Sequence, residues 1–421
     1  MKDILLSPFE EGQEVGKLAI QQKAFEQIEN LEVPTSKNEE WKYFQLKPFL
    51  NKDYSFNLSQ EISDEVVENL EFSKLKANHL VFVNGAFSAK HSQILENTSK
   101  IQILSFKDVL ENKKDLLEKY LKQIPKNTED IFGALNTAFA QDGAFICIEK
   151  GQELAYPIVL NFIVDASKGN TLSQNKNVIL AGENSRFSVV ENYLTLGQND
   201  SFQNLSTQFF VESYAHLEHY KIQKDTEKAH QIGTTEIVLE DNAYFANHTI
   251  SLSGGRIRNN LNILVGEHCE AYLNGLSLLK GKTVVDNHTI ADHLKPHSMS
   301  DELYKTILDE RSMSVFNGKV YVRPDAQKTN AFQSNANILL SQNARVDTKP
   351  QLEIWADDVK CSHGATTGVL DQEALFYLRA RGISKPKAIS LLLGAFAMEV
   401  LDRIENKNLK EHLQSLVENR L

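Results

Sequence analysis

The chain has 421 residues, of which 41% are hydrophobic and 24% are charged, and its formal net charge is −11. This length suggests two or three domains, and the composition is that of an ordinary globular protein. The acidic balance, without any stripe of Lys and Arg, argues against nucleic-acid binding. No apolar run approaches the roughly 18 residues of a transmembrane helix, so we expect no membrane span.

The start of the chain and its cysteines both favour a cytoplasmic protein. The first residues, MKD, lack the charged and apolar regions of a secretory signal. Cys147, Cys269 and Cys361 are widely spaced and form no C-x-x-C pair. Because three cysteines fit no disulfide framework, we expect reduced thiols.

Residues 1–140 predict a mixed, mainly helical N-terminal domain. Apolar spacing predicts a helix over 14–31, and residues 80–83 predict a strand. A second helix is expected from the N-cap Ser105 to about Ile124, and Thr128 is expected to cap a third. The connection between positions 34 and 48 carries three aromatic residues, Trp41, Tyr43 and Phe44.

Residues 141–370 predict a β-rich core that repeats itself. β-Branched and aromatic residues alternate with polar ones, apart from a helix-like insertion at 300–310. Small residues follow polar turns at positions 215, 243 and 271, spaced 28 residues apart, with related turns before Ser185 and Ala344. A fixed period of this kind favours a parallel β-helix, and an all-β sandwich with coincidental spacing is the alternative.

Asn and Gln are concentrated in TNAFQSNANILLS, residues 329–341. Such amides either stack as a ladder along successive coils or form a solvated face.

Residues 371–421 predict a C-terminal helical domain. Asp371 can cap a helix that Gly382 ends, Pro386 lies in the first turn of the next helix, and Leu409 begins the apolar face of the last. The middle helix has an apolar stripe at helical spacing that can cap the β-helix or bind a partner. The stripe consists of Ile389, Leu392, Leu393, Phe396, Val400 and Ile404.

No standard catalytic motif is present. The chain lacks a phosphate-binding loop, a G-x-S-x-G turn and an H-E-x-x-H helix. DNHTIADHLKPH, residues 286–297, matches no metal spacing and is interpreted as a polar loop. His216 and His219 lie three apart in a predicted strand, so they should face opposite sides. We therefore expect no enzyme activity in this chain alone.

One cluster in KCSHGATTG, residues 360–368, has ligand chemistry. Cys361 and His363 are two residues apart, so on a strand they share one face. A thiolate and an imidazole suit iron or zinc. Two ligands do not complete a metal site, so a second chain or a cofactor would have to supply the rest.

The run DDVKCSHGATTGVLDQEALFYLRARGIS resembles the SufB/SufD family of iron–sulfur cluster assembly proteins. Similar stretches are NEEWKYFQL, SDELYKTIL, VFNGKVYV and AQKTNAFQSNANILLSQNA, so the resemblance covers nearly the whole chain. It implies a right-handed parallel β-helix between helical ends.

The resemblance also implies a function as a scaffold subunit. Members pair through their β-helices as a SufB-like and a D-type subunit, and both bind a SufC-like ATPase through C-terminal helices. A nascent iron–sulfur cluster then forms near the junction of the two solenoids, where His363 and Cys361 occupy the family's motif positions. The isolated chain is expected to hold no cofactor, and a flavin acting in the assembled complex stays open.

The resemblance favours the D-type branch. B-type members resemble E-H-E-A-T-T-S at this motif, whereas carboxylates are replaced here by Ser362 and Gly364. A B-type cysteine should fall near Asn335, and none lies between Cys269 and Cys361. The alternatives are an autonomous B-type scaffold and a polysaccharide-active β-helix enzyme, and the isolated chain is either a homodimer or a monomer.

Overall fold

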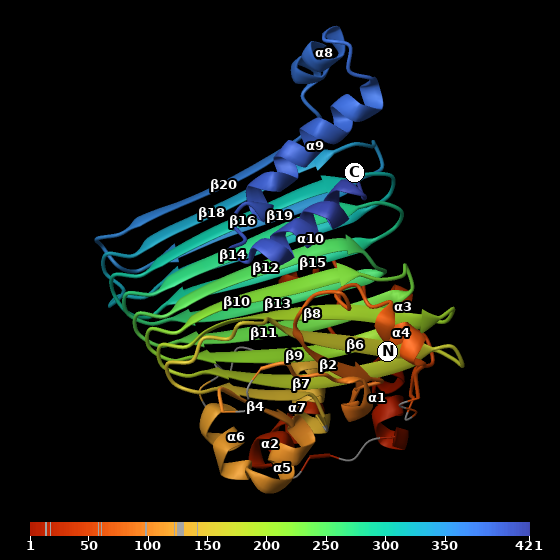
Figure 1. The fold of residues 1–421 in the computed structure, drawn as a ribbon, viewed down its shortest axis with the longest axis vertical. Coiled ribbons are helices and arrows are strands. Elements are labelled where there is room, and N and C mark those ends of the chain that lie inside the picture. The colour runs from red at the N-terminus through yellow and green to blue at the C-terminus, as the bar shows by residue number, and fades with distance from the viewer. Residues whose placement is uncertain are drawn as a thin grey trace.

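A computed structural model describes residues 1–12, 15–16, 18–57, 59, 61–96, 99–121, 123, 130–140 and 142–421. Its centre is a parallel β-solenoid of about seven turns, flanked by helical segments from both ends of the chain (Figure 1). In the described part of the chain, no helix combines the length and the apolar character that crossing a membrane requires.

Two ten-stranded sheets form the solenoid, and from β5 onward successive strands alternate between them. Sheet A contains β4 (Ile101–Ser105), β5 (Ala144–Ile148), β7 (Thr171–Ala181), β9 (Ser201–Val211), β11 (Ala229–Leu239), β13 (Arg256–Val265), β15 (Val284–His293), β17 (Met313–Val322) and β19 (Arg345–Ile354), with β1 (Ser55–Phe56) beside β7. Sheet B contains β3 (Ala86–Phe87), β2 (Asn78–Val83), β6 (Ile158–Ala166), β8 (Arg186–Gly197), β10 (His216–Lys224), β12 (Tyr244–Ser253), β14 (Glu270–Leu279), β16 (Met299–Leu308), β18 (Asn330–Leu339) and β20 (Lys360–Gly368). From β6 onward every pairing is parallel, which confirms the predicted parallel β-helix.

A small or polar residue occupies the corner that precedes each sheet B strand from β8 to β18. Strand register aligns the corners at Ser185, Ala215, Ala243, Cys269, Ser298 and Thr329. Ala271 is therefore not a corner, because it pairs with Phe245 inside the strands. The sequence repeat is therefore confirmed, but its period varies from coil to coil. The spacing of 28 residues between Ala243 and Ala271 is coincidental. Ala344 is a corner of sheet A instead, directly before β19.

The space between the sheets is apolar near the start of the sheet B strands and polar farther along them. The apolar part includes Leu217, Phe245 and Ile263. The polar part contains amide pairs that bridge successive coils, such as Gln223 with Asn259 at 2.9 Å and Asn259 with Asn287 at 2.9 Å. These pairs satisfy buried amides that would otherwise cost free energy.

The amide-rich segment 329–341 supplies part of this polar interior, as the ladder interpretation predicted. Gln333, Asn335 and Asn337 on β18 are buried. Asn337 Nδ2 donates to Asn335 Oδ1 at 2.7 Å and to the Thr366 carbonyl at 3.0 Å. The amides therefore connect the last two strands of sheet B.

Helical segments cover the outer faces of the two sheets. The N-terminal residues pack on sheet A through two apolar clusters that reach Phe202 and Phe210. The N-terminal elements are α1 (Lys2–Gly12), α2 (Ala19–Ile28), η1 (Glu39–Trp41), α3 (Lys47–Leu50), α4 (Asp64–Glu68), η2 (Ala89–His91), α5 (Phe106–Asn112), α6 (Lys114–Leu121) and α7 (Ile131–Phe139). Among them, α4 packs on sheet B instead, beside Val83 and Ile163. At the other end, α9 (Lys385–Leu401) and α10 (Lys407–Glu418) pack on the outer face of sheet B.

The N-terminal helix boundaries differ from those expected. The helix predicted at 14–31 is shorter, since α2 begins at Ala19, and α1 was not anticipated. The helix from Ser105 breaks at Lys113 into α5 and α6. Its expected end and the cap Thr128 lie outside the described residues. Asp130 caps α7, with its side chain accepting from the Gly133 N–H. The strand at 80–83 is confirmed as part of β2.

The prediction of a helix-like insertion at 300–310 is wrong, because most of this segment belongs to strand β16. Leu303 and Ile307 are four residues apart, which mimics one face of a helix. In the structure both point outward under α9 and α10, while Glu302 and Tyr304 point into the solenoid. Both faces of the strand are buried, so the usual alternation of polar and apolar residues is hidden.

The three expected C-terminal helices are confirmed as α8 (Gln372–Ala380), α9 and α10. Asp371 caps α8 by accepting from two backbone N–H groups, and Gly382 adopts the left-handed conformation, with φ +87°, that ends it.

Gly275→Ala should destabilise the solenoid. A Cβ at Gly275 would lie 2.2 Å from the ring of Tyr304, which is buried in the next coil. Overpacking of this kind costs about 1–3 kcal/mol. Urea unfolding would measure the loss, with Gly364→Ala as the matched control, because no atom lies within 4 Å of a Cβ there. Equal stability of the two variants would contradict the packing argument.

Glu302→Gln should stabilise the protein at alkaline pH. Burial raises the pKa of Glu302 from 4.5 to about 7, against the opposing hydrogen bonds from Thr289 and Gln333. The folded state therefore prefers the neutral acid, and this contribution to stability is complete below pH 4.5 and lost as the pH rises through 7. A shift of this size corresponds to about 3 kcal/mol.

Urea unfolding of wild type and Glu302→Gln at pH 5 and pH 8.5 tests this expectation. The permanently neutral glutamine should match the wild type at pH 5 and exceed it at pH 8.5. A stability difference that does not change with pH would show that Glu302 is ionised in the folded protein.

Candidate functional site

The solenoid is open at its C-terminal end. Within the described residues, β19 pairs only with β17 and β20 pairs only with β18, so each sheet ends in a strand with one free edge. The residues of β20 are almost all exposed, unlike those of the strands inside the solenoid. A free parallel edge presents unpaired N–H and C=O groups to which another chain can add.

Cys361 and His363 lie on this last strand. The register pairs them with the inward-facing Ala331 and Gln333 of β18, so both side chains face the interior of the open coil. This confirms their predicted common face. Cys361 is partly buried against the apolar core, and burial raises the pKa of its thiol, so that the ligating thiolate is disfavoured. His363 is exposed.

These two residues do not form a complete metal site by themselves. In the part of the chain that the structure describes, no group of three or more His, Cys, Asp or Glu side chains is placed to hold an ion. Any metal bound at His363 would therefore need further ligands from outside the described residues.

The predicted partner-binding stripe of α9 is divided between the protein interior and the surface. Leu393 and Val400 are fully buried against sheet B, whereas Ile389, Leu392 and Phe396 are partly buried beside them. Much of this stripe therefore packs within the chain, so its size alone does not require a partner.

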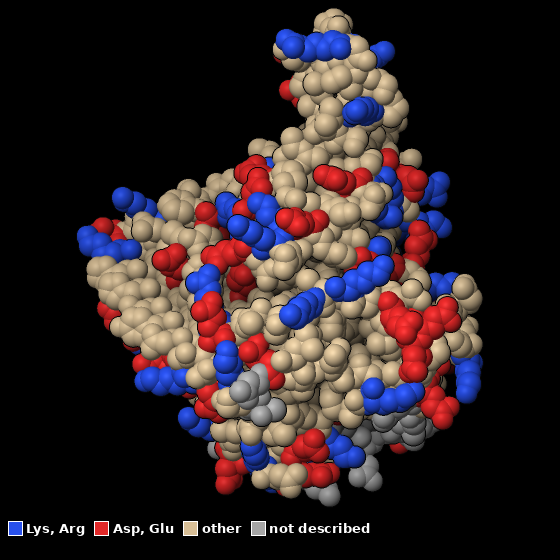
Figure 2. All heavy atoms as spheres, in the orientation of Figure 1, with Lys and Arg blue, Asp and Glu red and all other residues tan. Residues whose placement is uncertain are grey.

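Exposed apolar side chains are instead concentrated on an arm formed by α8 and the first half of α9. The arm projects beyond the solenoid (Figure 1), and its surface is mainly uncharged with Lys and Arg near its tip (Figure 2). Phe376 is 74% exposed and Tyr377 is 56% exposed, and Val369 and Leu391 are also exposed. Large aromatic groups in this position are characteristic of a protein-binding surface.

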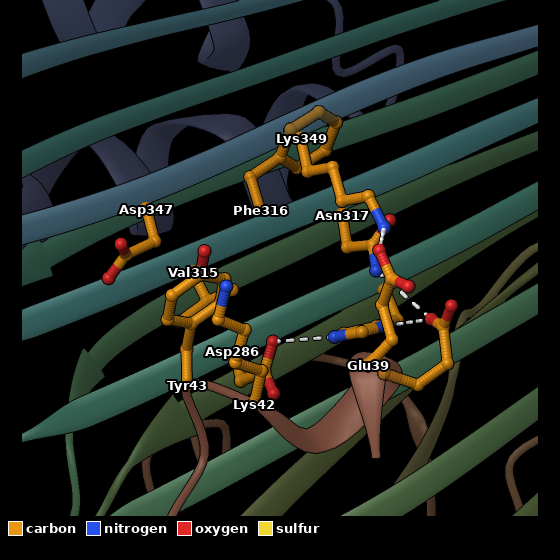
Figure 3. Close-up of a pocket in the computed structure, with 11 residues that line it drawn as sticks. Glu39, Lys42, Tyr43, Asp286, Val315, Phe316, Asn317, Asp347 and Lys349 are labelled. Atoms are coloured by element: carbon orange, nitrogen blue, oxygen red, sulfur yellow. Dashed lines mark hydrogen bonds and ion pairs between the residues drawn. The ribbon is translucent and has the colours of Figure 1, made fainter. Parts of the chain in front are cut away.

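A second cluster lies on the outer face of sheet A, beneath the segment that we call the Trp41 segment (residues 38–44). A hollow of about 110 Å³ lies between this segment and β15, β17 and β19, and Figure 3 shows the residues that line it. Glu40 contacts Lys319 at 2.7 Å and His288 at 3.3 Å, and Glu39 pairs with Lys349. The Trp41 segment is thus bound to the last coils of the solenoid by charges.

Beneath Glu40 lies a buried charged network. Arg258 stacks on the Trp41 ring at 3.8 Å and donates to Asp286 at 2.6 Å and to the Glu40 carbonyl at 2.7 Å. His288 lies 2.9 Å from the other oxygen of Asp286. The hydrogen bond with His288 lowers the pKa of Glu40 to about 2, although burial opposes this, and Lys319 adds to the effect. The network satisfies its own charges, so we interpret it as a structural clasp.

The polar-loop interpretation of residues 286–297 is therefore wrong for most of the segment. Residues up to His293 belong to β15, where Asp286 and His288 point outward and His293 points inward. Parallel pairing aligns Asp286 with Arg258, and Lys319 joins the network through Glu40. These residues are distant in sequence, so no local signal revealed the network. The motif NEEWKYFQL, which supplies Glu40 and Trp41, was the one indication available.

The expected separation of His216 and His219 is confirmed. His219 is buried inside the solenoid, where its Nδ1 lies 2.9 Å from Asn247 Oδ1. His216 faces outward and stacks on Tyr244 with ring centroids 3.9 Å apart.

Comparisons with known proteins agree with this architecture. Residues 16–160 match the model of the SufBD protein N-terminal region, and residues 162–396 match the SUF system FeS cluster assembly SufBD core domain. The iron–sulfur cluster assembly protein SufD of Escherichia coli is 31% identical over 404 residues, covering 95% of this chain and 92% of that protein.

Two further relatives extend the similarity across bacteria. A SufBD family iron–sulfur cluster assembly protein of Synechocystis is 31% identical over 405 residues, covering 94% of this chain and 89% of that protein. SufD of Bacillus subtilis is 24% identical over 414 residues, covering 95% and 92%. Because the two family models cover most of the sequence and relatives above 30% identity match it nearly end to end, the chain belongs to the SufBD family of the SUF iron–sulfur cluster assembly system.

Proposed function

We propose that this chain is a non-catalytic, cytoplasmic scaffold subunit that pairs with a SufB-like paralogue and binds a SufC-like ATPase. A nascent iron–sulfur cluster is then built at the junction of the two solenoids. The observation that carries the proposal is the open end of the solenoid, where His363 is exposed on the inward face of a strand with a free edge.

Pairing occurs by addition of the partner's strands to β19 and β20. Both edges lie at the same end of the solenoid, so a related solenoid can extend both sheets at once. Such pairing supplies backbone partners to both edges and covers the exposed inward face of β20. In isolation the same edges can join a second copy of this chain, and we propose a homodimer as its state without a partner.

His363 supplies a ligand to the cluster, or orients one, at this junction. An imidazole at a junction meets groups from the partner without any rearrangement of the solenoid. Cys361 has a smaller role, since its thiol is partly buried and its raised pKa disfavours the thiolate.

The ATPase binds the arm of α8 and α9. Phe376 and Tyr377 are too exposed to contribute to the core. They belong to α8, which projects beyond the solenoid (Figure 1). A nucleotide-driven movement of the ATPase could then reach the junction through α9, which packs on the same sheet B that ends in β20.

His363→Ala should leave the complex assembled but unable to build clusters. The substitution removes a nitrogen ligand from an exposed position and little packing. Co-purification with the SufB-like and SufC-like subunits measures assembly, and visible absorption after anaerobic reconstitution measures cluster formation. Cys361→Ser should have a milder effect, and Ser362→Ala, on the opposite face of β20, should behave as wild type.

Three other outcomes would revise this proposal. Weakened assembly of His363→Ala would indicate a structural role at the junction. Unchanged assembly and cluster formation would remove His363 from the site. Stable cluster formation by the isolated wild-type chain would favour the autonomous scaffold.

Replacing Phe376 and Tyr377 together with Ser should reduce affinity for the ATPase by at least about tenfold, because exposed aromatic residues at the centre of an interface commonly contribute 2 kcal/mol or more. Isothermal titration with the isolated ATPase measures the change. Tyr214→Asn is the matched control, since Tyr214 is 58% exposed at a remote turn and Asn tolerates its left-handed conformation. Full affinity in a well-folded double variant would exclude the arm.

A further inference from the structure

The Gln333 side chain is fixed inside the last coils. Gln333 is 3% exposed, and its Nε2 donates to Glu302 Oε2 at 2.5 Å. On the facing strand β17, a Cβ at Gly318 would lie 2.3 Å from Gln333 Nε2, so the glycine leaves the space that the amide fills. The orientation of this amide is therefore set by two elements, with its nitrogen directed to Glu302.

The carbonyl oxygen of the same amide has no hydrogen-bond partner within the described residues. An acceptor buried to this degree is normally satisfied, because leaving it unpaired costs about 1–3 kcal/mol. The amide nitrogen of Gln333 donates to Glu302 on β16, the neighbouring strand on one side. The neighbouring strand on the other side is β20, and the residue in register with Gln333 is His363.

We propose that Gln333 is a positioning residue for His363: the exposed imidazole rotates so that its ring N–H donates to the free carbonyl oxygen of Gln333, which fixes one tautomer of the ring. Side chains directly opposite each other on adjacent parallel strands are neighbours on the same face. Glu302, Gln333 and His363 occupy such positions on three successive strands.

The hydrogen bond determines which ring nitrogen is free. A neutral imidazole carries its proton on one nitrogen and a lone pair on the other, and the hydrogen bond made by the first selects the second as the ligand. Histidine ligands usually donate their N–H to an acceptor in this way, and loss of that acceptor typically costs 10–100-fold in affinity or activity. The relevance to cluster assembly rests on the function proposed above, whereas the hydrogen bond itself does not.

The test uses the isolated, metal-free chain with ¹⁵N-labelled histidine. At a pH where the imidazole is neutral, the ¹⁵N shifts of His363 report the tautomer ratio, and His363→Ala identifies its signals among the 12 histidines. One tautomer should dominate in the wild type. Gln333→Met, which keeps the volume and removes the carbonyl acceptor, should change the ratio by about three- to tenfold, the effect of one hydrogen bond.

Asn337→Leu is the matched control. Asn337 is as deeply buried on the same face of the same strand and also has an unpaired carbonyl oxygen, but it is in register with Thr367 rather than His363. Its substitution should leave the His363 tautomer unchanged, and circular dichroism verifies that both variants are folded. A His363 tautomer ratio that is identical in wild type and Gln333→Met would overturn the inference.

Cluster assembly separates this inference from the proposed function. If both hold, Gln333→Met lowers the rate of cluster formation by about 10–100-fold without weakening co-purification. A changed tautomer with a normal rate of cluster formation would mean that Gln333 orients a histidine that is not a ligand. A normal tautomer in Gln333→Met together with inactive His363→Ala would leave the ligand role intact and exclude Gln333.

Discussion

The parallel pairing of each coil with the next is the constraint on which the rest of this structure depends. A strand inside the solenoid satisfies its backbone groups through the strands of the preceding and following coils. At the N-terminal end the antiparallel pairs β2–β3 and β4–β5 terminate the two sheets. At the C-terminal end the described chain provides no equivalent cap for β19 and β20, so the architecture itself produces an edge suited to another solenoid. The family motif with His363 lies on this edge.

The interior of the solenoid combines two ways of filling space. Apolar residues pack near one corner, and amides, hydroxyls and a few charged groups fill the rest. Glu191 is an example of a charged group in the polar part of the interior. Burial alone would raise its pKa, but the nearby Lys221 and His219 hold the pKa below its usual value. Buried groups of this kind are tolerated only where each finds a partner. Several buried amides in the described residues keep one unpaired atom, and the oxygen of Gln333 differs from these because the residue in register on the last strand is a histidine.

Segments from the two ends of the chain make the outer faces different. On sheet A, Glu40 of the Trp41 segment forms ion pairs with His288 and Lys319 in the last coils (Figure 3). A segment from the N-terminal part of the chain therefore stabilises the C-terminal end of the solenoid. On sheet B, α9 and α10 pack through apolar residues and leave α8 projecting. The pairing edge, the clasp and the arm thus lie around the same end of the molecule, while each uses a different chemistry.

The sequence by itself determined the β-helix, the helical C-terminus and the common face of Cys361 and His363, since these depend on local alternation, turns and caps. It misassigned residues 300–310 because burial under α9 gives both faces of β16 large side chains. It placed a corner at Ala271 because only pairing between coils reveals the true one at Cys269. Only the tertiary structure brought Arg258, Asp286 and Glu40 together, buried half of the α9 stripe and aligned Gln333 with His363. These contacts join residues on different coils, and their register depends on the varying lengths of the turns between them, which no local pattern specifies.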